Sequence, residues 1–138
     1  MIEVKNLQKK YGELEVLKNI NTTISKGDVI AIIGPSGGGK STFLRCINRL
    51  ELADSGEILI NKQNILDKEI DINKIRQKVS MVFQHFNLFA NKNVMENLCL
   101  TPIKTGILSQ EEAIKKAKLL LAKLGLADKE NLMPHKPS

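Results

Sequence analysis

The sequence is poor in several residue types that mark common classes of protein. It has no Trp and only one Tyr in 138 residues, and its 21 basic residues include only three Arg. The two cysteines, Cys46 and Cys99, are far apart and form no CxxC pair, which predicts reduced, buried thiols rather than disulfides or a metal site. No long apolar run is present, and charges interrupt residues 1–10, where a signal peptide needs an apolar core. We therefore expect a cytoplasmic chain without a membrane span.

The rest of the composition is that of an ordinary globular domain. Hydrophobic residues make up 42% and charged residues 26% of the chain, which is enough for one domain with a core of its own. The net charge of +6 is compatible with a surface for nucleic acid or anionic lipid. A solvated, Lys-rich exterior is favoured, because nucleic-acid modules commonly interleave Arg and aromatic residues with their Lys.

The most informative stretch is GPSGGGKST, which fits the pattern GxxxxGK[ST] of a phosphate-binding loop. Glycines lack a Cβ, so this backbone can turn its N–H groups around an anion, and a following helix adds unpaired N–H groups and a partial positive charge. With Gly at about 7% of residues, a chance match in so short a chain is of order ~0.5%, which disfavours an ordinary Gly-rich turn. The predicted nucleotide-binding residues are Gly34, Pro35, Ser36, Gly37, Gly38, Gly39, Lys40, Ser41 and Thr42.

Three side chains of this loop have predicted roles toward ATP and Mg²⁺. Lys40 can place a full positive charge beside the β/γ-phosphates and is expected to take part in catalysis. Ser41 offers its hydroxyl to Mg²⁺, and Thr42 can donate to a neighbouring phosphate oxygen.

Periodicity predicts an α/β order around the loop. Alternation favours strands over residues 2–11, 14–24 and 57–60, whereas the continuous apolar runs at 29–33 and 79–83 predict strands buried on both faces. Helices are predicted from residue 40 to about 50 and after the capping residue Asp71. Two further helices start at Asn93 and Ser109, the first limited by Pro102 and the second ended by Gly125.

These motifs, in this order, resemble the ATP-binding subunit of an ABC transporter. The resemblance rests on Tyr11 and on three segments: LKNINTTISKGDVIAIIGPSGGGKSTFLRCINRLE, SGEI and MVFQHFNLF. Within the family, the last of these segments, followed by VMENL and TPI, is most similar to importers of polar amino acids. Gly38 stands where the family more often has Ser, which the loop should tolerate. The resemblance implies an α/β P-loop core with an N-terminal antiparallel β part over residues 1–85, followed by the start of a helical subdomain over residues 86–138.

The resemblance implies roles for three residues outside the loop. Tyr11 matches the aromatic residue on which adenine stacks, and this role is favoured over that of a half-buried Tyr at a strand end. Val16 matches the apolar neighbour of the base, or is an ordinary core residue. Gln84 matches the glutamine that touches Mg²⁺ and the attacking water, which makes it a candidate catalytic residue and metal ligand.

The resemblance also implies a protein partner. In the family, the region matching Gln84 to Glu96 meets a short cytoplasmic helix of the membrane permease, at the inner face of the cell membrane. Four apolar side chains could line that groove or form the core of the subdomain: Phe86, Leu88, Phe89 and Val94. A full-length protein would form a homodimer around two ATP molecules, and no direct contact with nucleic acid is expected.

The family's catalytic carboxylates have no counterpart in this sequence. No Asp–Glu pair follows an apolar run, and the LSGGQ signature and the switch histidine would lie beyond Ser138. We therefore expect the N-terminal part of a longer ATPase, which binds ATP and Mg²⁺ but does not hydrolyse ATP alone. Its sheet would be incomplete, leaving two apolar segments without neighbouring strands.

Two other functions remain open at the level of sequence. One is a soluble ABC-type ATPase that acts on nucleic acid or the ribosome, which the positive charge permits and the segment MVFQHFNLF disfavours. The other is a nucleotide-binding module without enzymatic activity, as the missing carboxylates suggest.

Overall fold

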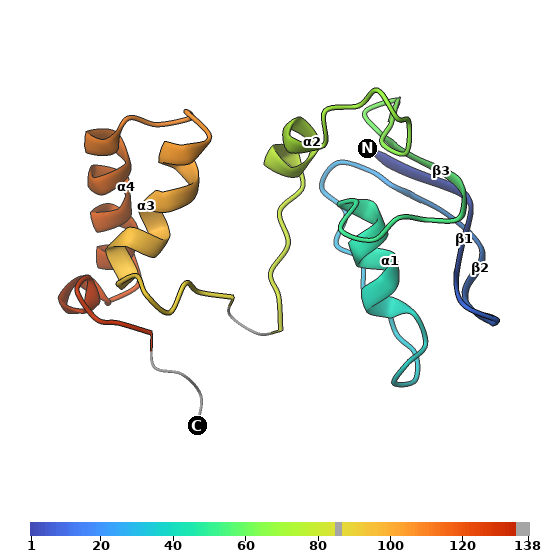
Figure 1. Ribbon diagram of the computed structural model, residues 1–138, viewed down its shortest axis with the longest axis horizontal. Helices are drawn as coiled ribbons and strands as arrows, with labels where there is room; N and C mark the ends of the chain where they lie inside the picture. The colour runs from blue at the N-terminus through green and yellow to red at the C-terminus, as the bar shows by residue number, and fades with distance from the viewer. Residues whose placement is uncertain (85–86, 135–138) are drawn as a thin grey trace. The chain divides into compact units, whose positions relative to one another are not determined.

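The chain forms two compact units, Met1–Met81 and Val82–Ser138, which Figure 1 shows in a computed structural model. The structure describes residues 1–84 and 87–134. Within those ranges no helix has the length and apolar character needed to cross a membrane. The predicted boundary between residues 85 and 86 lies outside the described residues.

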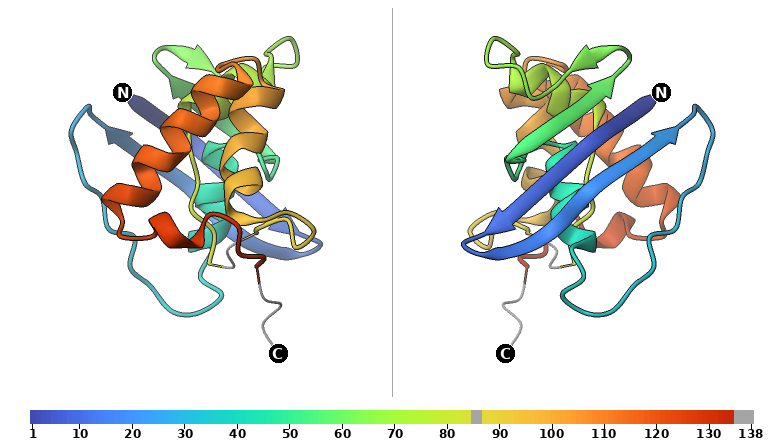
Figure 2. Two further views of the ribbon diagram at one scale, coloured as in Figure 1. Left: turned by 90° about the vertical axis from the view of Figure 1, so that its left-hand side faces the viewer. Right: turned by 90° about the vertical axis from the view of Figure 1, so that its right-hand side faces the viewer.

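The first unit contains a four-stranded antiparallel sheet in the order β2-β1-β3-β4. The strands are β1 (Ile2–Tyr11), β2 (Leu14–Ile24), β3 (Ser55–Ile60) and β4 (Gln63–Asn64), and the right-hand view of Figure 2 shows β1 between β2 and β3. The predicted strands at 2–11 and 14–24 are confirmed, and the third begins two residues earlier than predicted. The short β4 was not expected from the sequence.

Two helices cover the buried side of this sheet. Helix α1 (Lys40–Ile47) contributes Phe43, Cys46 and Ile47 to the core, and α2 (Ile72–Lys78) contributes Ile75. Asp71 caps α2 as predicted, because its side chain accepts a hydrogen bond from the backbone N–H of Asn73 at 3.0 Å. The rest of the buried cluster comes mainly from the strands: Val4, Leu7, Leu17, Ile58, Ile60 and Ile65.

The second unit is a helical hairpin of α3 (Val94–Lys104) and α4 (Gln110–Lys123), followed by the short helix η1 (Ala127–Lys129). Asn93 and Ser109 form the predicted capping boxes, and Cys99 packs against Ala113 and Ala117 in a small core. Pro102 lies inside α3, which ends two residues later, so the proline does not mark the boundary itself. The burial predicted for both cysteines is confirmed.

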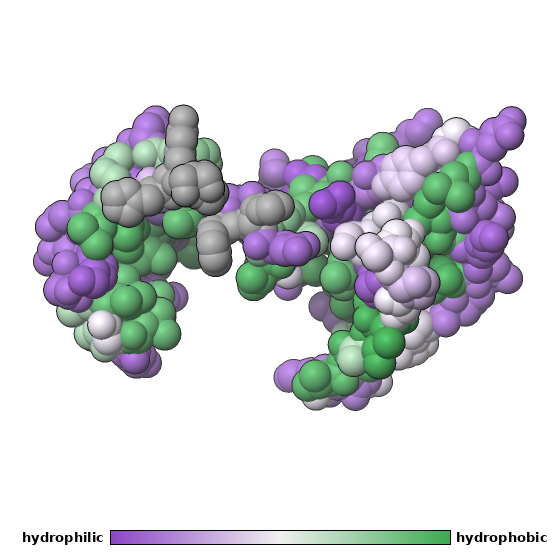
Figure 3. Space-filling model, turned by 90° about the horizontal axis from the view of Figure 1, so that it is seen from below, coloured by the Kyte–Doolittle hydropathy of each residue, from purple (hydrophilic) through white to green (hydrophobic). Residues whose placement is uncertain are grey.

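The two strands predicted as buried on both faces are not formed, which corrects the sequence-based assignment. Residues 29–33 and 79–83 have no regular secondary structure, and the side chains of Val29, Ile33 and Val82 are 98%, 91% and 96% exposed. An extended segment becomes a strand only when a neighbouring strand satisfies its backbone groups. The expectation of apolar segments without neighbours is confirmed, and Figure 3 shows open apolar surface, in green, on the first unit.

Candidate nucleotide-binding site

The glycine-rich loop enters α1 through backbone conformations that only glycine adopts readily. Gly37 and Gly39 have φ angles of 76° and 79°, and the N–H of Gly38 donates to the carbonyl oxygen of Pro35 at 3.1 Å. A Cβ added to Gly39 would lie 2.9 Å from both Cγ1 and the carbonyl oxygen of Val16. The loop therefore needs Gly39 for its backbone angle and for its close approach to β2.

Val16 reaches the loop because β2 has an irregularity at that point. Lys9 pairs with Leu17 and Lys10 pairs with Glu15, so Val16 is an extra residue in β2, a β-bulge. Bulges redirect a side chain relative to the regular alternation of a strand. The structure thus brings one predicted site residue, Val16, into contact range of another, Gly39.

The N-terminus of α1 is open to an anion, unlike the other α-helices. No side chain caps it, and its first turn contains no acidic residue, whereas Asp71, Asn93 and Ser109 cap α2, α3 and α4. The hydrogen-bond ladder starts with the N–H of Phe43, which donates to the carbonyl oxygen of Gly39 at 2.8 Å. The backbone N–H groups of residues 40–42 therefore precede the ladder and are suited to a phosphate.

Lys40 folds its side chain back along the loop. Its Nζ donates to the carbonyl oxygens of Gly34 at 2.9 Å and of Pro35 at 2.6 Å. Ser41 is exposed and Thr42 is half-buried on the first turn of α1. These groups supply one cation, two hydroxyls and a set of backbone N–H donors, which fits a magnesium-bound polyphosphate.

Tyr11 ends β1 on the same hairpin as Val16. Its side chain is 45% exposed, and the Nζ of Lys9 lies 5.3 Å from the centroid of its ring. The exposed ring can take a flat apolar group, as adenine stacking requires.

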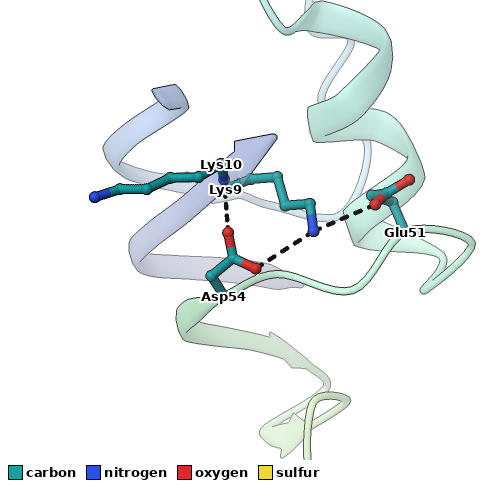
Figure 4. Close-up of polar contacts among 4 residues, drawn as sticks. All are labelled: Lys9, Lys10, Glu51 and Asp54. Carbon is teal, nitrogen blue, oxygen red and sulfur yellow. Dashed lines mark hydrogen bonds and ion pairs between the residues drawn. The ribbon is translucent and has the colours of Figure 1, made fainter. Parts of the chain in front are cut away.

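Sequence reasoning missed a charged cluster beneath this end of the hairpin, shown in Figure 4. The side chain of Lys9 is only 11% exposed, and its Nζ lies 3.3 Å from a carboxylate oxygen of Glu51 and 3.3 Å from one of Asp54. Partial burial lowers the pKa of Lys9, but the hydrogen bonds and charges of the two carboxylates outweigh it, and the pKa is raised overall. The pKa of Asp54 is lowered, chiefly by the hydrogen bond from the backbone N–H of Lys10 and secondly by the hydrogen bond and charge of the Lys9 side chain. No motif in the sequence indicates this cluster, because its members are distant along the chain.

The remaining predicted residues belong to the second unit. Gln84 is exposed at the start of this unit. Leu88 and Phe89 are 53% and 54% exposed, and Val94 is half-buried at the start of α3. Leu88 and Phe89 are therefore not members of the small core of this unit. Phe86 lies outside the described residues.

Asn97 holds the segment that presents Leu88 and Phe89, a role that the sequence did not indicate. Its Oδ1 accepts from the backbone N–H of Phe89 at 2.8 Å, and its Nδ2 donates to the carbonyl oxygens of Lys92 and Asn93 at 2.8 and 3.0 Å. One side chain thereby fixes the turn that leads into α3.

The antiparallel sheet, the glycine-rich loop and the open N-terminus of α1 define a P-loop protein of the α/β class. Comparison with known proteins gives the family: the sequence pattern described as ABC transporter matches residues 17–138. The chain belongs to the ABC transporter family, in the group of ATP-binding cassettes.

Individual relatives agree with this assignment. The chain is 48% identical over 134 residues to "Glutamine transport ATP-binding protein GlnQ" of Geobacillus stearothermophilus, covering 97% of this chain and 55% of that protein. It is 48% identical over 138 residues to "Arginine transport ATP-binding protein ArtM" of Bacillus subtilis (strain 168), covering 100% of this chain and 58% of that protein. The chain thus spans about half the length of the curated relatives it matches.

A solved structure has the same fold. It is a dimer of the ATP-binding cassette MJ0796 in a post-hydrolysis state, bound to ADP and Pi. The TM-score is 0.82 and the identity is 34%, and the match covers 100% of this chain and 63% of that chain.

Proposed function

We propose that this chain carries the ATP-binding site of the energy-supplying subunit of an importer for polar amino acids. The observation that carries the proposal is the loop at residues 34–42, with its glycine-dependent backbone and its uncapped helix. Relatives named for the transport of glutamine, arginine and L-cystine support the substrate class. The particular amino acid would be chosen by other subunits.

In this proposal the loop binds the phosphates of ATP through its backbone. Lys40 would exchange the carbonyl oxygens of Gly34 and Pro35 for phosphate oxygens, because an ammonium pairs more strongly with an anion than with a neutral carbonyl. Mg²⁺, when bound, neutralises charge on the phosphates, and Ser41 would hold it through its hydroxyl. Tyr11 and Val16 would take the base.

Transfer of the phosphoryl group to water needs a group that positions the water. Gln84 is the proposed residue for this step and for a second contact to Mg²⁺, since its amide can both accept and donate. The sequence offers no carboxylate pair after an apolar run, so we propose that the chain binds ATP and does not hydrolyse it alone.

We propose a cytoplasmic location at the inner face of the membrane, with residues 84–96 as the contact to a permease. The exposure of Leu88 and Phe89 and the turn fixed by Asn97 support a docking role for this segment. In the same proposal residues 1–85 form the ATP-binding core, residues 86–138 begin the helical subdomain, and the full-length protein acts as a homodimer.

The site assignment predicts that Lys40→Ala weakens binding of ATP with Mg²⁺ by at least about tenfold, because a charge-assisted hydrogen bond is lost. Titration with a fluorescent ATP analogue measures the affinity. Lys26→Ala is the matched control, since it removes the same charge from an exposed turn outside the loop. Equal affinities for the two variants would contradict the site.

Phosphate release on the same samples tests the proposed division between binding and hydrolysis. Binding without release is the expected result. Release that depends on Lys40 would mean that the chain contains a catalytic base, and this result would overturn the proposal that it only binds.

A further inference from the structure

We infer that Lys9 is a positioning residue that holds the ring of Tyr11 in place for stacking against a purine base. The inference rests on the proposed function, because it concerns the base end of the same nucleotide site. Lys9 and Tyr11 are two residues apart in β1, and the Lys9 Nζ lies 5.3 Å from the centroid of the Tyr11 ring. This distance is within the range of about 6 Å in which a cation is attracted to an aromatic face.

The ammonium group of Lys9 can act in this way because two carboxylates immobilise it. Its Nζ lies 3.3 Å from Oε1 of Glu51 and 3.3 Å from Oδ1 of Asp54. Dashed lines in Figure 4 mark these two contacts. A surface Lys would sample many rotamers, whereas this side chain is only 11% exposed. A cation that is fixed in space restrains the ring beside it.

The fold does not need the Lys9 ammonium to connect β1 to the segment before β3. Asp54 already makes that connection through the backbone: its Oδ2 accepts from the N–H of Lys10 at 2.6 Å, and its own N–H donates to the carbonyl oxygen of Gln8 at 2.9 Å. Partial burial of an ammonium carries a desolvation cost that an apolar side chain would avoid. We therefore assign the charge of Lys9 a role other than connecting the strands, namely its interaction with the ring of Tyr11.

The ring of Tyr11 keeps enough free surface for a ligand. It is 45% exposed although Lys9 lies beside it. Restraining the ring before binding lowers the entropy lost when a base stacks on it. Lys9 should therefore raise the affinity for nucleotides and not for ligands that lack a base.

Two probe ligands separate binding through the base from binding through the phosphates. One is ATP with Mg²⁺, and the other is inorganic tripolyphosphate with Mg²⁺, which has phosphates but no base. Tyr11 is the only Tyr and the chain has no Trp, so intrinsic fluorescence excited near the tyrosine band reports on this ring alone. Lys9→Met removes the charge and keeps the length of the side chain. Lys10→Met is the matched control, because the hydrogen bond from Lys10 to the cluster comes from its backbone N–H and not from its side chain.

We expect Lys9→Met to weaken ATP binding about 3- to 10-fold, to leave tripolyphosphate binding within about twofold, and to reduce the change in tyrosine fluorescence on ATP binding. Lys9→Arg should restore most of the affinity, since it keeps the cation. Lys10→Met should match the wild-type chain with both probes.

Unchanged ATP affinity in Lys9→Met would overturn the inference, and so would an equal loss for both probes, which would mean that Lys9 only supports the fold. If Lys9→Met does not fold, Glu51→Gln makes the same comparison, because it frees one side of the ammonium and leaves Asp54 in place. Its expected result is again a loss confined to ATP.

The proposed function is tested by the wild-type chain, whereas the role of Lys9 is tested by the variants. A wild-type chain that binds neither probe overturns the nucleotide site itself and the inference with it. A wild-type chain that binds both probes equally retains the phosphate loop but overturns the base contact and the role of Lys9.

Discussion

Gly38 and Gly39 are neighbours in one loop, yet the structure places different demands on them. Gly39 has a φ of 79°, and a Cβ there would lie 2.9 Å from two atoms of Val16. Gly38 has no such backbone requirement, and its nearest neighbour would be the carbonyl oxygen of Pro35 at 3.0 Å. A shift of a few tenths of an ångström in that exposed turn accommodates a side chain at Gly38, but the strand beside Gly39 is held by the sheet.

We therefore predict that Gly39→Ala greatly weakens ATP binding while Gly38→Ala and Gly38→Ser retain it. The left-handed conformation alone costs a residue with a Cβ about 1–2 kcal/mol, and the contact with Val16 adds to this. Nucleotide titration and thermal denaturation of all three variants measure the effect. Equal losses at the two positions would show that the loop conformation differs in solution.

At the scale of secondary structure elements, the sequence predicted local features well. The capping residues Asp71, Asn93 and Ser109 were predicted and confirmed, because a cap involves groups within three residues. The two strands of the β1–β2 hairpin were also predicted, since their alternation and the turn at Gly12 are adjacent in the chain.

Features that depend on distant partners were predicted poorly. The apolar run at residues 29–33 is typical of a buried strand, but its backbone finds no neighbouring strand among the described residues. The placement of Lys9 between Glu51 and Asp54 depends on where α1 ends and β3 begins, which no local pattern specifies. The phosphate loop was found from its motif, whereas the β-bulge that brings Val16 to it could not be.

The capping box of α4 should make the stability of this helix depend on pH. Hydrogen bonds from the side chain and backbone of Ser109 hold the pKa of Glu112 below its ordinary value. A carboxyl group with a lowered pKa stabilises the folded state fully above its unfolded pKa and loses that contribution as the pH falls through its folded pKa. The helix should therefore lose stability as the solution becomes more acidic than the ordinary pKa of Glu, near 4.5.

Circular dichroism between pH 7 and pH 3 checks this expectation. Glu112→Gln should lower helix stability at pH 7 and flatten the pH dependence at the acidic end. Glu111→Gln is the matched control, because among the described residues Glu111 makes no capping hydrogen bond. Identical pH profiles for the two variants would contradict the role of the capping box.

At the scale of the whole molecule, the first unit has a small core and a large open apolar surface. Ten residues form its buried cluster, while Val29, Ile30 and Ile33 are 98%, 55% and 91% exposed. An open pocket of about 470 Å³ lies between this segment, the sheet and α1, with Ile20, Phe43 and Leu44 among its lining residues. Monomeric proteins rarely leave so many large apolar side chains together in water, and such patches mark contact surfaces or sites of aggregation.

This surface leads to a prediction about substitutions that are usually harmful. Val29→Ser and Ile33→Ser should leave the unfolding midpoint of the chain almost unchanged, because neither side chain is buried, and should reduce self-association and the binding of an apolar dye such as ANS. Leu7→Ala is the comparison: Leu7 is 0% exposed, and its truncation should cost about 2–5 kcal/mol. Analytical ultracentrifugation and dye fluorescence give the two readouts. A loss of stability in Val29→Ser as large as that in Leu7→Ala would mean that residues 29–33 are packed in solution, against a second copy of the chain or within the first unit.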